Sequence, residues 1–208
     1  DFFYHDDLSS QANHPYQSIP QETVSTLSND GLNRFSFFPF SGFERLTWSL
    51  CNGFVSAAND CLASKGFSVG RHEIAGGVFL DVYNLHMDAG SGADDVAARR
   101  AQMDQLLLYM ESYSSGNAVL VAGDTNLTGY DPDDEPVLQK LILEGGFTDS
   151  ARHLGAEESI DRILYRSSSS LALEATFWEI AQEFIDGSGT PLSDHEAIHV
   201  EMNWTLLP

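Results

Sequence analysis

The stretch AVLVAGDTN, residues 118–126, decides the fold class of this chain. Its first five residues are apolar, which predicts a short strand that is buried on both faces, as in a sheet covered by other layers. Gly123 ends the apolar run, and Asp124 and Asn126 follow it, so that the strand delivers polar groups to a rim of the sheet. The stretch therefore predicts an α/β protein with candidate functional residues at strand ends.

The segments around this strand agree with that architecture. Residues 97–113 carry apolar side chains at helical spacing, with two aspartates shortly before them that favour the positive end of a helix dipole. Residues 78–86 (VFLDVYNLH) alternate apolar and polar side chains and predict a strand, and residues 136–144 predict a helix that stops at two glycines. Further strands are expected at residues 37–40, 47–54, 160–165, 171–179 and 197–203, and a long loop at residues 1–30. Strands with few helices between them predict an α/β layered sandwich, and we expect residues 1–208 to form one domain.

The composition restricts the function. With 42% hydrophobic residues the 208-residue chain can bury a core, and no apolar run approaches the roughly 20 residues that cross a bilayer. Ten basic and 31 acidic residues leave a net charge of -21, which repels nucleic acid at long range. A histone-like or transcription-factor role is excluded, and no stable nucleic-acid complex is expected. The charge remains compatible with an enzyme that meets phosphate through a bound metal.

The two cysteines, Cys51 and Cys61, are separated by nine residues. They are either two buried thiols or a disulfide that closes a short loop and contributes about 2–3 kcal/mol. Two cysteines are too few for a zinc quartet. We favour the disulfide, and together with the strong acidity and the few lysines it predicts a secreted, extracellular protein.

Polar residues gather at four predicted strand ends, at residues 84–86, 123–126, 161–162 and 193–195. Each group alone is a weak signal, because a lone histidine is more often structural and an aspartate beside a strand is often a turn or a cap. Together they supply two histidines, three carboxylates and two amides. Oxygen ligands of this kind bind Mg²⁺ or Mn²⁺, and a histidine held by an aspartate works as a general base. The set therefore predicts metal-assisted phosphoryl chemistry.

These motifs resemble, in order, those of the endonuclease/exonuclease/phosphatase superfamily, which has a deoxyribonuclease-like fold. Residues 30–40 resemble the family's early strand pair, and residues 83–87 (YNLHM) are similar to its N-T-H-L motif. Residues 123–126 (GDTN) match G-D-x-N, residues 159–163 (SIDRI) resemble D-x-I, and residues 193–195 are the terminal S-D-H. The resemblance implies a four-layered α/β sandwich and hydrolysis of a phosphodiester bond by a metal-activated water.

The resemblance also assigns roles to residues. It implies that His195 is the general base, that Asp161 orients it, and that His86 hydrogen-bonds a phosphate oxygen and stabilises charge in the transition state. Asp124 would position or activate the attacking water, and Asn126 would hold the phosphate or a metal. An imidazole that acts as a base needs a fixed tautomer, which a carboxylate partner supplies.

The same resemblance implies a metal site and contacts with substrate. Asp194, Asp124 and Asn126 would hold Mg²⁺, with Mn²⁺ or Ca²⁺ as alternatives, and Asn84 and Lys65 would contact the substrate. We expect a phosphodiester substrate and a monomer.

One family feature is missing. The family's main metal ligand is a Glu in a Q-E motif that closes an early strand, and no such strand precedes Asp30. Gln21 and Glu22 match the Q-E motif in residue type, but they follow Pro20 in a polar stretch and do not close an apolar strand. We therefore expect an N-terminally truncated domain that lacks its first strands and is inactive in this form. A non-catalytic binding module on the same fold is the alternative.

Two short segments bear on the substrate. Residues 65–67 (KGF) and the pattern Arg99, Gln102, Leu106 resemble secreted neutral sphingomyelinases, which would make the substrate a phospholipid. A secreted nuclease of this fold is the other possibility. A phosphomonoesterase for inositol phosphates is disfavoured, because basic residues that would grip several phosphates are scarce.

Overall fold

The computed structural model describes residues 5–20, 29–53 and 57–208. Its elements are α1 (His5–Gln11), β1 (Tyr16–Gln17), β2 (Phe35–Ser36), β3 (Ser41–Thr47), the 3₁₀ helix η1 (Ala57–Leu62), β4 (Gly66–Ala75), β5 (Val78–His86), α2 (Ala93–Tyr113), β6 (Ala118–Asp124), α3 (Glu135–Leu143), β7 (Thr148–Asp149), α4 (Ser150–Leu154), β8 (Asp161–Arg166), β9 (Leu171–Ile180) and β10 (Ile198–Leu206). The mixture of helices and strands confirms the α/β class predicted from the sequence.

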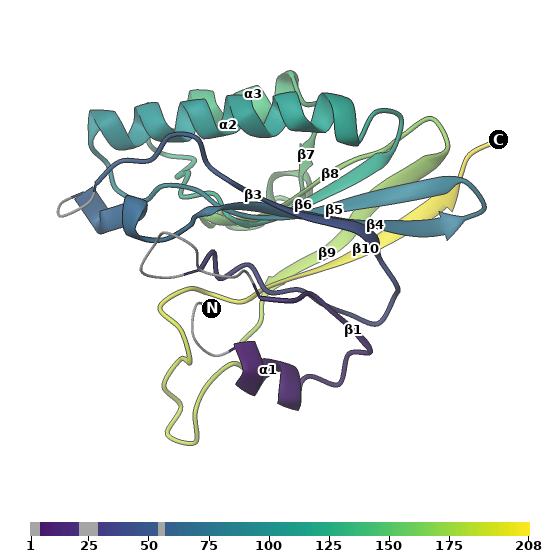
Figure 1. Cartoon of the computed structure of the whole chain (residues 1–208), viewed down its shortest axis with the longest axis horizontal. Helices are drawn as coiled ribbons and strands as arrows, with labels where there is room; N and C mark the ends of the chain where they lie inside the picture. The colour runs from purple at the N-terminus through teal and green to yellow at the C-terminus, as the bar shows by residue number, and fades with distance from the viewer. Residues whose placement is uncertain (1–4, 21–28, 54–56) are drawn as a thin grey trace.

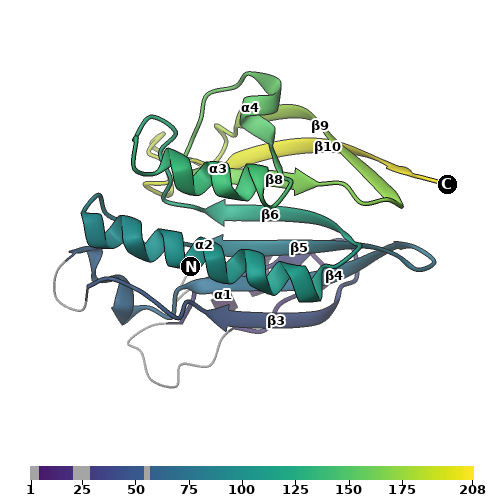
Figure 2. The same ribbon diagram turned by 90° about the horizontal axis from the view of Figure 1, so that it is seen from above.

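A six-stranded mixed sheet forms the centre of the molecule, with the order β3-β4-β5-β6-β8-β7. Figure 2 shows β3, β4, β5, β6 and β8 side by side in this order. β5 and β6 run parallel, because the long helix α2 connects them and returns the chain to the same end of the sheet. The other neighbouring strands pair antiparallel. This order places β6 between β5 and β8, so that the carboxyl ends of β5 and β6 lie beside the start of β8.

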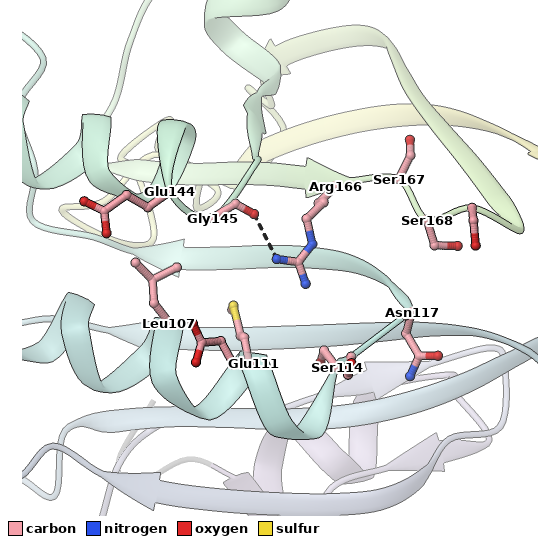
Figure 3. A pocket seen from close by; sticks show the side chains of 13 residues that line it. Leu107, Glu111, Ser114, Asn117, Glu144, Gly145, Arg166, Ser167 and Ser168 are labelled. Atoms are coloured by element: carbon pink, nitrogen blue, oxygen red, sulfur yellow. Dashed lines mark hydrogen bonds between the residues drawn. The ribbon is translucent and has the colours of Figure 1, made fainter.

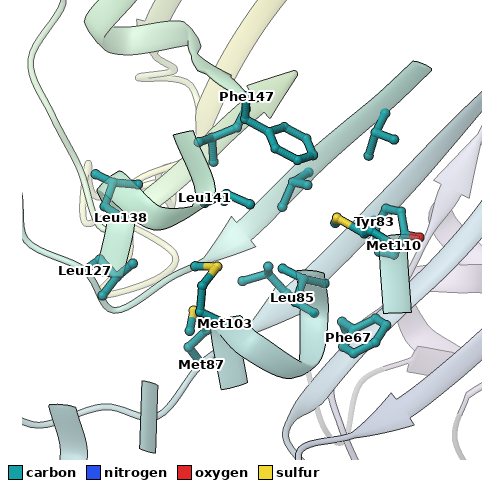
Figure 4. Close-up of a cluster of buried hydrophobic side chains, with 14 of the residues drawn as sticks. Phe67, Tyr83, Leu85, Met87, Met103, Met110, Leu127, Leu138, Leu141 and Phe147 are labelled. Carbon is teal, nitrogen blue, oxygen red and sulfur yellow. The ribbon is translucent and has the colours of Figure 1, made fainter. Parts of the chain in front are cut away.

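Helices α2 and α3 cover one face of this sheet (Figure 1). β5 shows why the main core lies on that side, since Tyr83 and Leu85 on one face of the strand are buried while Leu80 and Val82 on the other face are only half-buried. Apolar side chains from the helices meet this face, as Figure 4 shows for Met103, Met110, Leu138 and Leu141. The period of two in the strand therefore sets which face receives the helices.

The antiparallel pair β9 and β10 lies against the opposite face, where these strands contact β6 and β8 (Figure 1). The short helix α1 lies farther out on that side. The layers are thus two helices, the six-stranded sheet, the two-stranded sheet and the small N-terminal elements. None of the helices in the part of the chain that the structure describes is long and apolar enough to cross a membrane.

The structure corrects the expected loop at residues 1–30 over residues 5–20, whereas residues 1–4 and 21–28 lie outside the described residues. Helix α1 occupies His5–Gln11, with Asp6 and Asp7 in its first turn, where negative charge stabilises a helix. Strand β1 follows at Tyr16–Gln17 and pairs with β2, which lies about twenty residues farther along the chain. Such pairing with a distant partner leaves no local pattern in the sequence.

The strands predicted at residues 37–40 and 47–54 are also wrong, since the chain forms β3 between them, at Ser41–Thr47. Where the first strand was expected, Ser36 Oγ donates to the carbonyl of Phe38 at 2.8 Å and accepts from its amide at 3.0 Å, which closes a turn. Strand β4 was not predicted at all, because its glycines and charged residues hide the alternation. Gly66 of β4 has a packing reason, since a Cβ there would lie 2.0 Å from the carbonyl oxygen of Leu46.

The remaining predicted elements are confirmed with shifted ends. β5 has the predicted bounds of residues 78–86, whereas α2 begins at Ala93 rather than at residue 97. The strands β6, β8, β9 and β10 and the helix α3 lie within a few residues of their predicted bounds. The disulfide between Cys51 and Cys61 is confirmed.

Candidate active site

Three neighbouring strands bring His86, Asp124 and Asp161 into one row. His86 at the end of β5 is the register partner of Asp124 at the end of β6, and Asp124 is the partner of Asp161 at the start of β8. The Nε2 atom of His86 lies 3.3 Å from Oδ2 of Asp124. The sequence predicted these side chains at three separate strand ends. They converge because the strand order places β6 between β5 and β8.

The segment between β9 and β10 completes the row with His195. Its Nδ1 lies 2.8 Å from Oδ2 of Asp161, and its Nε2 lies 3.8 Å from Oδ2 of Asp124. The backbone amide of His195 donates to Ser193 Oγ at 3.1 Å, which shapes the turn that presents the ring. The hydrogen bond to Asp161 raises the pKa of His195 above its ordinary value of 6.5. The contact predicted between His195 and Asp161 is present.

Backbone geometry at residues 123–126 explains why glycine and asparagine occupy their positions in the GDTN motif. Gly123 has φ +136°, and a Cβ there would lie 2.1 Å from the carbonyl oxygen of Leu85 on the neighbouring strand. Asn126 has φ +50°, a left-handed conformation that asparagine tolerates better than most residues. Its backbone amide donates to Asp124 Oδ1 at 2.8 Å. The glycine permits close approach of β5 and β6, and the asparagine closes the turn that follows.

The side-chain amide of Asn126 is held from two sides. Its Nδ2 donates to the carbonyl of Met87 at 3.0 Å and to Asp124 Oδ2 at 3.1 Å. With its nitrogen engaged in this way, the side-chain oxygen Oδ1 is the atom of the amide that is left to accept a donor or bind a cation. This orientation agrees with the predicted use of Asn126 as a metal or phosphate ligand.

Burial sets the charge state of the site. The pKa of His86 falls to about 3, first because the ring is desolvated and then because Lys65 and His195 place positive charge nearby. His86 is therefore neutral at pH 7 and can donate one hydrogen bond without adding charge. The pKa of Asp124 is raised, chiefly by burial and further by the neighbouring carboxylate of Asp161.

Among the residues that the structure describes, Asp124, Asp161 and His195 are the one group of three that could share a cation, with ligand atoms within 4.8 Å of one another. The carboxylates of Asp124 and Asp161 repel each other, which contributes to the raised pKa of Asp124. A divalent cation bound between them would remove this repulsion. Oxygen donors suit Mg²⁺ or Mn²⁺, so the donor set fits the expected metal. The predicted ligand Asp194 lies next to His195, exposed and outside this group. Its role as a ligand stays a prediction.

The other predicted contact residues are placed as follows. Asn84 lies on β5 and its Nδ2 donates to the carbonyl of Asn33 at 3.2 Å. Lys65 is buried, with its ammonium paired with Asp60 and 3.2 Å from the carbonyl of Met87. Contact of either residue with substrate stays a prediction, and Lys65 already has protein partners. The Gln21-Glu22 pair lies outside the described residues.

Sequence reasoning missed one residue that supports the site. The indole Nε1 of Trp48 donates to the carbonyl of His86 at 2.7 Å and fixes the end of β5 from outside the strand ladder. Trp48 is 6% exposed and belongs to the hydrophobic core. No local pattern marks this contact, since the two residues are 38 positions apart.

Two pockets differ in their relation to this site. One, of about 580 Å³, is lined by the segment between β9 and β10, including Asp194 and His195 together with Phe184, Ile185 and Leu192. The other, of about 360 Å³, lies where β6 begins and β8 ends and is lined by Arg166, several serines and the C-terminal ends of α2 and α3 (Figure 3). Because Asp124 ends β6 and Asp161 begins β8, the second pocket lies at the opposite end of these strands.

The comparisons with known proteins fit this geometry. No protein-family model matches the chain. Sphingomyelinases of Mycobacterium tuberculosis and Mycobacterium bovis are 32% identical to it over 217 aligned positions that cover 94% of this chain and 42% of theirs. This similarity supports the predicted resemblance to the sphingomyelinase-like branch of the endonuclease/exonuclease/phosphatase superfamily. It spans about two fifths of the length of these curated relatives.

Several solved structures share the fold of this chain. Beta toxin from Staphylococcus aureus aligns over 93% of this chain and 80% of its own, with a TM-score of 0.65 and 17% identity. A double mutant of beta toxin with bound magnesium ions aligns over 94% of this chain and 78% of its own, with a TM-score of 0.59 and 16% identity. A humanized Danio rerio TDP2 aligns over 79% and 65%, with a TM-score of 0.60 and 20% identity. These matches show the deoxyribonuclease-like fold.

Proposed function

We propose that the chain is the catalytic part of a metal-dependent phosphodiesterase that hydrolyses a phospholipid of the sphingomyelin type. The observation that carries the proposal is the contact of His195 with Asp161 and Asp124 at the joined strand ends. The 32% sequence identity with sphingomyelinases, over 94% of this chain, supports the choice of reaction. The disulfide between Cys51 and Cys61 supports an extracellular location, where such bonds persist.

The proton chemistry follows from the histidine contacts. Asp161 accepts from Nδ1 of His195, which places the ring proton on that nitrogen and leaves the lone pair on Nε2. Nε2 then takes the proton of an attacking water as the water oxygen forms a bond to phosphorus. The phosphorus–oxygen bond to the lipid alcohol breaks in the same displacement, and the departing oxygen takes up a proton from solvent. The neutral His86 ring has one N–H, and its Nε2 faces Asp124 in the structure. With a cation on the Asp124 carboxylate, this N–H would donate to a phosphate oxygen as negative charge develops there.

Asp124 and Asp161 would hold the metal, with Asn126 Oδ1 and His195 close by. When bound, a divalent cation neutralises the developing charge on phosphate oxygens and polarises the attacking water. Mg²⁺ is the metal found in one of the beta toxin structures of this fold, and it is our proposal for this chain.

The surroundings of His195 favour a lipid over a nucleic acid. Phe184, Ile185 and Leu192 line the adjacent pocket and are 53%, 49% and 66% exposed. Exposed apolar side chains of this size mark a contact surface for an apolar partner. The net charge of -21 disfavours a polyanion at the same place.

The test compares Mg²⁺-dependent hydrolysis of sphingomyelin in vesicles with that of duplex DNA, each with and without a chelator. It uses the 208-residue chain and, in parallel, any longer natural form that contains it. We expect chelator-sensitive release of phosphocholine from at least one of the two forms. Hydrolysis of DNA alone would replace the lipid by a nuclease substrate, and a folded protein that turns over neither would favour a non-catalytic binding module.

Histidine variants separate catalysis from folding. His195→Ala is expected to lower kcat by about 10²–10⁴-fold with little change in Tm, because the side chain is 42% exposed and contributes little to the core. His199→Ala is the matched control, since His199 makes a similar 3.0 Å contact with Glu179 on β9 and β10, outside the row of candidate catalytic residues. Equal loss of activity in both variants would contradict the assignment of His195.

A further inference from the structure

The carbonyl oxygen of Met87 connects a buried lysine with the candidate active site. It accepts from Nζ of Lys65 at 3.2 Å and from Nδ2 of Asn126 at 3.0 Å. Met87 is fully buried and directly follows His86, and its amide donates to the carbonyl of Asp124 at 2.9 Å. Movement of this one peptide group would therefore disturb both the Lys65 ammonium and the Asn126 side chain.

An ion pair holds the segment that carries this carbonyl. Asp60 pairs with the ammonium of Lys65 and also accepts from the backbone amide of Ala89 at 2.8 Å. The side chains of Lys65 and Asp60 are 9% and 2% exposed, so water competes little for these contacts. The pair thus forms hydrogen bonds to the chain after β5 at two points, the carbonyl of Met87 and the amide of Ala89.

The disulfide fixes the position of this ion pair. Cys61 directly follows Asp60 and is bonded to Cys51, while the amide of Cys61 donates to the carbonyl of Gly53 at 3.0 Å. On the other side of Lys65, the amide of Trp48 donates to the Lys65 carbonyl at 3.0 Å. Both partners of the pair are therefore attached to parts of the chain that cannot shift independently.

Asn126 depends on this arrangement for its orientation. Its backbone has φ +50°, and its amide could rotate to exchange Oδ1 and Nδ2 if no acceptor selected the nitrogen. The Met87 carbonyl provides that selection together with Asp124 Oδ2, because both acceptors favour the NH₂ group over the oxygen. The oxygen of the amide is then kept for a ligand.

We propose that Lys65 and Asp60 are positioning residues that hold the Met87 carbonyl and thereby fix the Asn126 side chain with its oxygen available to metal or phosphate. The use of that oxygen in catalysis rests on the proposed function, whereas the orientation of the amide does not. The ammonium of Lys65 acts inside the protein, through Met87, and not on the substrate.

The variants are chosen to avoid a buried unpaired charge. Lys65→Met alone leaves the Asp60 carboxylate without its cation and can prevent folding. The double variant Asp60→Asn with Lys65→Met removes both charges and keeps an acceptor for the Ala89 amide. Lys65→Arg retains a cation and tests rescue. Lys140→Met is the control, because Lys140 is the other lysine of the chain and forms exposed ion pairs with Asp104 and Glu144.

The first measurement does not need activity. Hydrogen exchange of the Asn126 side-chain NH₂ is followed by NMR, with the signal assigned by its absence in Asn126→Ala. We expect exchange at least tenfold faster in the double variant, partial recovery in Lys65→Arg, and the wild-type rate in Lys140→Met. An unchanged rate in the folded double variant would overturn the proposal, whatever the enzyme does.

The second measurement uses Mg²⁺-dependent hydrolysis. We expect the double variant to lose at least tenfold in kcat with KM changed less than twofold, and to have no further effect when it is combined with Asn126→Ala. A rise in KM alone would overturn the proposal in favour of direct substrate binding by Lys65. A wild-type protein without turnover refutes the proposed function, and the exchange experiment then decides this inference by itself.

Discussion

Replacing Gly123 by alanine tests whether close contact between β5 and β6 builds the candidate site. The added Cβ would lie 2.1 Å from the carbonyl oxygen of Leu85, 2.9 Å from its nitrogen and 3.0 Å from its carbonyl carbon. All three are backbone atoms of the neighbouring strand, so they cannot move aside without separating the ladder. The φ of +136° adds strain for any residue with a Cβ.

The size of the effect follows from these two contributions. An L residue in such a sparsely populated conformation costs about 1–3 kcal/mol. Forcing a methyl group into packed surroundings costs about another 1–3 kcal/mol. We therefore expect a loss of about 4 kcal/mol, which lowers Tm by roughly 8–16 °C in a domain of this size. Because Asp124 is the next residue, activity should fall more than stability alone explains.

Two other glycines separate strain from collision. Gly116 has φ +78° but open space within 4 Å, so Gly116→Ala should cost only the strain, about 1–2 kcal/mol. Gly76 has open space and no positive φ, so Gly76→Ala should leave Tm nearly unchanged. Thermal unfolding followed by circular dichroism measures all three. If Gly123→Ala costs no more than Gly116→Ala, close contact of the strands does not explain the glycine.

Three further predictions concern stability. Phe67→Ala should lower the free energy of unfolding by about 3–5 kcal/mol in denaturant titrations, because this fully buried ring packs against several other aromatic rings. Arg162→Met should cost about 3–5 kcal/mol, because it leaves Asp149 buried beside an apolar side chain, and a loss below 1 kcal/mol would show that the ion pair is not essential. Hydrogen bonds from Arg152 lower the pKa of Glu135, so their stabilisation is present above the unfolded pKa near 4.5 and is lost as the pH falls through the lower folded pKa. Glu135→Gln should flatten the acid limb of the stability profile by about 0.5–1 kcal/mol, as acid titration of unfolding would show.

Part of the fold was predictable because its signals are local. The alternation in residues 78–86 predicted β5 with its observed bounds, and the apolar run at residues 118–122 predicted β6. Both strands lie in the middle of the sheet. One face of β5 is buried and the other is half-buried, which produces the alternation, whereas the apolar residues of β6 form a continuous run. β4 also lies inside the sheet, but no local pattern indicated it. Its glycines are required by close packing and its charged residues by contacts with other strands, so they interrupt the alternation.

The sequence by itself determined the candidate catalytic residue types and their place at strand ends, because turns that follow strands need glycine, aspartate and asparagine in local order. Tertiary structure alone decided which of them meet. His195 reaches Asp161 across 34 positions, and Lys65 turns inward to Asp60 and Met87 although its motif predicted a contact with substrate. Such contacts depend on strand order and on the burial of charge, and both arise only when the whole chain has packed.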